Sequence, residues 1–95
     1  MESDLAKEPT STKPIRFSGH ARDQLRYRGV SEEEVIEAIR TAPWQPAELG
    51  RLECRKDFPF GREWNGRSYT TKQVRPIFAD ESREIVVVTV YSYYF

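Results

Sequence analysis

His20 is the residue of this sequence best suited to acid–base chemistry, because it is the one histidine among 95 residues and follows a predicted helix start. Ser18 is a favourable N-cap, which would place His20 at the second helical position. The positive end of the helix dipole favours a neutral imidazole, which accepts protons near neutral pH. Free N–H groups at the same end can hold a phosphate oxygen. These properties suit cleavage of an RNA phosphodiester, which requires a base, an acid and cations on the phosphate.

Positive charge is concentrated between residues 51 and 75, where seven Lys or Arg residues accompany three carboxylates, in a chain with no net charge. If Asn65-Gly66 forms a two-residue turn, Lys56 lies directly opposite Arg75. Two opposed cations repel each other unless an anion lies between them, so this pair is the predicted phosphate site. The predicted phosphate or RNA contacts are Lys56, Arg75, Arg55 and Lys72.

Aromatic residues in the same half of the chain could stack on bases or supply a hydroxyl group. These features also have structural interpretations, because a histidine beside an N-cap often bonds a loop carbonyl and tyrosines of an apolar strand often form core. A second function therefore stays open: a non-catalytic binding module, homodimeric through its aromatic edge, whose basic hairpin meets an acidic or nucleic-acid partner. The aromatic candidates are Trp64, Tyr69, Tyr91 and Tyr93.

Several function classes are disfavoured by what the sequence lacks. It contains none of the motifs typical of nucleotide hydrolases, dinucleotide-binding enzymes, esterases or zinc proteases. One histidine and one cysteine cannot form an ordinary zinc site, so neither a metal nor a cofactor is expected. Cys54 is interpreted as a small buried hydrophobic residue. The lack of a disulfide pair, signal peptide or membrane-span pattern favours a cytoplasmic setting without a membrane partner.

The elements that must position these residues begin with helices. Residues 1–14 are polar and are predicted to be a disordered leader, followed by a single domain over residues 15–95. A short strand is expected at residues 15–17, and then a helix from Ser18 to about Arg28 that ends at Gly29. A second helix over residues 30–40 is predicted from its capping box, in which Ser31 is the N-cap and Glu34 the third helical residue.

The second half of the chain is predicted to form strands. Residues 51–58 alternate, Asn65-Gly66 favours a hairpin turn, and the return strand over residues 68–78 should be interrupted at Pro76. With a turn at residues 80–83, Arg75 would lie opposite Val88. Residues 84–95 are apolar on both faces, which is typical of the central strand of a sheet. The predicted fold is α+β, with two N-terminal helices packed on an antiparallel meander of three to four strands.

The two-helix segment resembles a family named the domain of unknown function 4258, which is similar to toxins of the RelE and BrnT type. The resemblance rests on a Ser-x-His-Ala start at Ser18–Ala21, on Arg28-Gly29-Val30 and on the Ser-Glu-Glu helix that follows. A closing Val-Val-Thr-Val-Tyr at Val87–Tyr91 belongs to the same pattern, whereas Gln24 stands where the family usually has an arginine.

This resemblance implies a RelE/ParE-like fold, which is shared with metal-independent ribonucleases. Such enzymes leave the chemistry to a histidine, basic residues and a hydroxyl group. The resemblance therefore implies that His20, Arg28 and Tyr91 are catalytic, that RNA is the substrate and that an antitoxin is a candidate protein partner.

Overall fold

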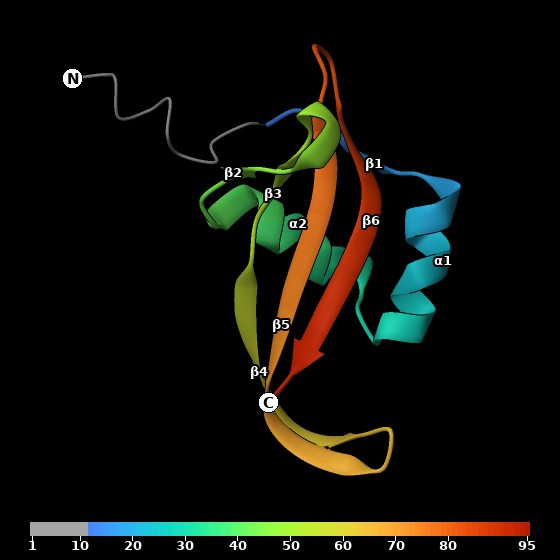
Figure 1. The fold of residues 1–95 in the computed structure, drawn as a ribbon, viewed down its shortest axis with the longest axis vertical. Coiled ribbons are helices and arrows are strands. Elements are labelled where there is room, and N and C mark those ends of the chain that lie inside the picture. Colours follow the sequence, from blue (N-terminus) through green and yellow to red (C-terminus); the bar gives the residue numbers. More distant parts are fainter. Residues whose placement is uncertain (1–11) are drawn as a thin grey trace, which may run out of the picture.

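Two helices pack against one face of a six-stranded sheet in the computed structural model, which describes residues 12–95 (Figure 1). The protein is therefore α+β as predicted, but the expected three to four strands were too few. The predicted strand over residues 51–58 is divided between two strands, Leu52–Glu53 and Lys56–Trp64, and the strand Gln45–Pro46 has no sequence pattern of its own. In chain order the elements are β1 (Ile15–Phe17), α1 (Gly19–Arg28), α2 (Glu32–Thr41), β2 (Gln45–Pro46), the short turn η2 (Glu48–Gly50), β3 (Leu52–Glu53), β4 (Lys56–Trp64), β5 (Arg67–Asp80) and β6 (Ile85–Tyr94).

Both helices begin after their predicted N-cap residues, and α1 ends at Gly29 as predicted, whereas α2 extends to Thr41, one residue beyond the predicted end. The Ser18 hydroxyl accepts a hydrogen bond from the N–H of Ala21 at 3.1 Å, and Gly29 ends α1 in the left-handed conformation. The predicted capping box of α2 is present, since Ser31 and Glu34 exchange side-chain-to-backbone hydrogen bonds of 3.0 and 3.1 Å. Local sequence was sufficient here because each cap satisfies N–H groups within its own turn.

The strand order is β1-β6-β5-β3-β2, and β4 also pairs with β5. The predicted short strand at residues 15–17 is confirmed, and it pairs in parallel with Ile85–Val87 of β6. The last strand is internal as expected, but β5 is the middle strand of the sheet. The reason is its 14-residue length, which allows β5 to pair with β6 along one edge and with both β3 and β4 along the other.

Two predicted registers are wrong. Lys56 lies opposite Val74 rather than Arg75, because the irregularity between Pro59 and Arg62 adds one residue to β4. Arg75 lies opposite Tyr91 rather than Val88. This second difference has two sources: the turn between β5 and β6 lies one position later in the chain than predicted, at residues 81–84, and β6 has an extra residue opposite the step from Ile77 to Phe78. The sheet irregularity was predicted at Pro76, which instead pairs regularly with Val90.

Alternate residues of β5 point to opposite faces of the sheet. Val74 and Phe78 belong to the buried core beneath the helices, whereas Arg75 and Ile77 face the other side. The core joins α1 and α2 to β5 and β6, and it consists mainly of Ala21, Leu25, Val35, Ala38, Ile39, Val74, Phe78, Ile85, Val87 and Val90.

The polar leader predicted over residues 1–14 lies mostly outside the described residues, which begin at residue 12. Within the described part, Lys13 forms an ion pair with Asp80 and the Pro14 carbonyl accepts a hydrogen bond from the N–H of Ile85. No helix among residues 12–95 has both the length and the apolar character needed to cross a membrane.

Candidate functional site

Tyr91 is the centre of the candidate site, because two arginine side chains lie against its ring. The guanidinium carbon of Arg28 is 5.4 Å from the ring centroid, and that of Arg75 is 5.3 Å away. Arg28 comes from the last turn of α1, Arg75 from β5 and Tyr91 from the opposing position of β6. Such contacts are favourable cation–π interactions. The structure thus brings together three residues that were predicted separately.

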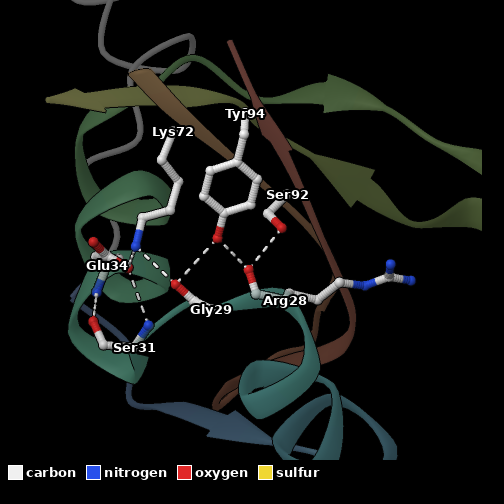
Figure 2. A network of polar contacts seen from close by, with 7 residues as sticks. All are labelled: Arg28, Gly29, Ser31, Glu34, Lys72, Ser92 and Tyr94. Carbon is white, nitrogen blue, oxygen red and sulfur yellow. Dashed lines mark hydrogen bonds and ion pairs between the residues drawn. The ribbon is translucent and has the colours of Figure 1, made fainter. Parts of the chain in front are cut away.

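The edge of β6 explains how Arg28 reaches this site. Strand β1 covers that edge only as far as Val87, and α1 covers the part that follows. Gln24 accepts a hydrogen bond from the N–H of Val90 at 2.8 Å through its side-chain oxygen. The Arg28 carbonyl accepts hydrogen bonds from the hydroxyls of Ser92 and Tyr94, at 2.9 and 2.5 Å, while its guanidinium points away from this network (Figure 2). The main chain of Arg28 is thereby anchored and its side chain is free to contact Tyr91.

Glu53 holds Arg75 in a fixed orientation. Its Oε1 atom accepts hydrogen bonds from Nε of Arg75 at 3.1 Å and from Nη2 at 2.6 Å, and the Glu53 side chain is only 9% exposed. The third nitrogen of Arg75 donates to the Tyr93 hydroxyl at 3.1 Å. Hydrogen bonding to Glu53 is the main cause that raises the pKa of Arg75, so the guanidinium remains charged. Arg55 approaches the other carboxylate oxygen of Glu53, at 3.7 Å.

A cavity of about 610 Å³ opens beside this cluster on the sheet face opposite the helices. Two arginines and two glutamates contribute to its lining, and Arg28 and Arg55 lie next to lining residues. The surroundings therefore contain four guanidinium groups and two carboxylates, an excess of two positive charges. The lining residues are Pro46, Ala47, Glu48, Leu49, Arg51, Glu53, Arg75, Ile77, Thr89 and Tyr91.

Both of the lysines predicted to contact RNA lie on the helix-covered face, away from Arg75. Lys56 is 3.8 Å from a carboxylate oxygen of Glu37 in α2. The Lys72 side chain is 5% exposed and its ammonium group contacts Glu34 at 2.9 Å and the Gly29 carbonyl at 2.8 Å (Figure 2). Lys72 therefore joins β5 to the turn between the helices, and its charge is already compensated.

His20 is exposed on the first turn of α1, eight residues before Arg28. At 1.5 Å of rise per residue, the two positions are about 12 Å apart along the helix axis. Among residues 12–95, no hydrogen bond or ion pair joins the imidazole to another side chain or to the backbone. The structure does not bring His20 into the cluster of Arg28, Tyr91 and Arg75.

Glu53 and Arg51 are the site residues that sequence reasoning missed. Glu53 pairs with Ile77 across the sheet, which makes it a diagonal neighbour of Arg75 on the same face. No local sequence pattern predicts this contact, because β3 has only two residues. It pairs with residues 77 and 78 of β5, beyond the part of β5 that pairs with β4. Within the described residues, no group of three or more His, Cys, Asp or Glu side chains is arranged to hold a metal ion.

The fold and the site together define a small α+β protein with an arginine–tyrosine cluster on the sheet face opposite its helices. The family model for the domain of unknown function DUF4258 matches residues 17–92. The chain belongs to this family, and the matched region contains every residue of the cluster. Searches of curated proteins and of solved structures gave no significant match.

Proposed function

We propose that the protein binds single-stranded RNA on the sheet face opposite the helices and cleaves it as a metal-independent endoribonuclease with a RelE-type fold. The main support is the pair of guanidinium groups on the single ring of Tyr91. Arg75 is compensated by Glu53, but no carboxylate pairs with Arg28 among the described residues. Two neighbouring cations with one counter-charge form a favourable site for the phosphate of a polynucleotide.

Cleavage would use groups that already surround this position. The Glu53 oxygen that Arg75 does not bond could accept the proton of the 2′-hydroxyl, whose oxygen then attacks phosphorus. The bond from phosphorus to the 5′-oxygen breaks, and the Tyr91 hydroxyl supplies the proton for the leaving oxygen. Solvent then restores both side chains. His20 is not assigned a role on this phosphate, because it lies about 12 Å from Arg28 along α1.

A non-catalytic RNA-binding module is the second candidate. The hydrogen bonds of Arg75 favour this candidate. Each of the three guanidinium nitrogens already has a partner, which is either Glu53 or Tyr93. An arginine fixed in this way can bind phosphate through its remaining N–H groups without taking part in a reaction. The two candidates share one binding surface and differ only in whether the phosphodiester is cleaved.

Arg28→Ala tests the proposal, with Arg26→Ala as the matched control in the same helical turn. Binding is measured by fluorescence anisotropy with a labelled single-stranded RNA, and cleavage by gel electrophoresis of the same RNA in EDTA. Losing a charge-assisted contact should weaken binding by roughly 10- to 100-fold in Arg28→Ala. Arg26→Ala should change it little. The fold should persist in both variants, because Ser92 and Tyr94 bond the Arg28 main chain rather than its side chain.

Tyr91→Phe separates the two candidates. The ring and its contacts with both arginines are retained, so RNA binding should remain, whereas cleavage should be lost if the hydroxyl supplies a proton. Binding by the wild-type protein without cleavage in EDTA would support the module instead. Equal affinities of Arg28→Ala and Arg26→Ala, or no RNA binding by the wild type, would refute the proposed site.

A further inference from the structure

Two turns of this protein share a backbone conformation but differ in their residues. The Asn65-Gly66 turn between β4 and β5 has φ values of 53° and 85°. The Leu49-Gly50 turn between β2 and β3 has φ values of 62° and 72°, and the N–H of Arg51 donates to the Glu48 carbonyl at 3.1 Å across it. Positive φ at both central residues is typical of a type I′ turn, which prefers Asn-Gly.

Leu49 is an unfavourable residue for its position. A bulky side chain is disfavoured at positive φ, whereas asparagine and glycine tolerate it. Burial does not compensate for this conformation, because Leu49 is 84% exposed. No other large hydrophobic residue in the described part of the chain is as exposed. A leucine that is both strained and exposed suggests a role other than stabilising the fold.

The position of Leu49 indicates what that role is. It lines the same cavity as Arg51, Arg75 and Tyr91, at the end of the short β2–β3 hairpin. The cations around this cavity suit the phosphates of a polynucleotide, whose remaining apolar surface is the face of its bases. We infer that Leu49 contacts a nucleobase of the bound RNA, an inference that rests on the function proposed above.

The test uses Leu49→Asn and Leu49→Gly, which relieve the conformation and remove the aliphatic side chain. Affinity is measured with a labelled single-stranded RNA and with an RNA of equal length and charge that carries abasic ribose units. Both variants should bind the normal RNA roughly five- to tenfold more weakly. They should bind the abasic RNA as the wild type does. Leu49→Asn should also raise the Tm, by about 4–8 °C, because the left-handed strain is relieved.

Each other outcome has a definite meaning. Unchanged affinity in the Leu49 variants, with affinity still lost in Arg28→Ala, would overturn the base contact and leave the RNA site intact. An equal loss of affinity for the abasic RNA would also overturn the inference, because the contact would then not be with a base. A lower Tm in Leu49→Asn would overturn it as well, because Leu49 would then serve to stabilise the fold. No RNA binding by the wild type would remove the proposed function itself, and with it the inference.

Discussion

Gly29→Ala tests how the β4–β5 hairpin closes over the turn between the two helices. Gly29 has a φ of +70°, and a Cβ atom added there would lie 2.5 Å from the Tyr94 hydroxyl and 2.6 Å from the edge of the Trp64 ring. These two rings are stacked, with centroids 5.1 Å apart. The hydroxyl of Tyr94 is also bonded to the Arg28 carbonyl. Neither neighbour can therefore move away without losing another contact.

The expected loss of stability has two parts. The left-handed conformation costs about 1–2 kcal/mol for alanine relative to glycine. Crowding against the two rings adds about 1–3 kcal/mol, as in other overpacked sites. Gly29→Ala should thus lower the free energy of unfolding by about 2–5 kcal/mol. Gly66→Ala is the control, because Gly66 has a φ of +85° but no atom within 4 Å of an added Cβ. Only the conformational part, about 1–2 kcal/mol, applies to it.

Urea unfolding followed by circular dichroism measures both losses. The difference between the variants should be about 1–3 kcal/mol, and the Tm should fall by about 4–8 °C for each kcal/mol in a domain of this size. Tryptophan fluorescence adds a local measurement, because the methyl group added in Gly29→Ala meets the Trp64 ring directly, whereas the one added in Gly66→Ala does not. Equal destabilisation of the two variants would refute the close approach of Trp64 and Tyr94 to the helix turn.

Two further predictions concern buried polar groups. Lys72→Met should lower the free energy of unfolding by about 2–3 kcal/mol in urea denaturation, because it removes the cation bonded to Glu34 and Gly29. The control is Arg67→Met, a change at the exposed start of β5. A loss of stability in Lys72→Met no larger than that in the control would contradict this prediction. Burial raises the pKa of the Cys54 thiol to about 12, so a thiol reagent at pH 8 should label the protein only through molecules that unfold. The thiol ionises at a lower pH in the unfolded state than in the folded state. The Cys54 thiol should therefore lower the stability by roughly 1.4 kcal/mol per pH unit between about pH 9 and 12, and Cys54→Ala, measured in parallel, should lack this contribution to the slope.

The candidate site was only partly predictable. Arg28, Tyr91 and Arg75 were each identified from the sequence, but their association was not, because it depends on the register between β5 and β6. The predicted partner of Arg75 was Lys56, and one additional residue in β4 places that lysine on the opposite face. A shift of one residue reverses the face of every side chain that follows, so small errors in register change the composition of a site completely.

The sequence by itself determined the helices, the Asn-Gly hairpin turn and the α+β class. Caps and turns satisfy backbone groups within a few residues, and their signals are therefore local. Only the tertiary structure decided which cations meet. It covered Lys72 with the helix turn, paired Arg75 with a glutamate from a two-residue strand and brought Arg28 around the edge of β6 to the ring of Tyr91. These contacts join residues 20 or more positions apart, and sheet irregularities that no local pattern specifies decide which of them can form.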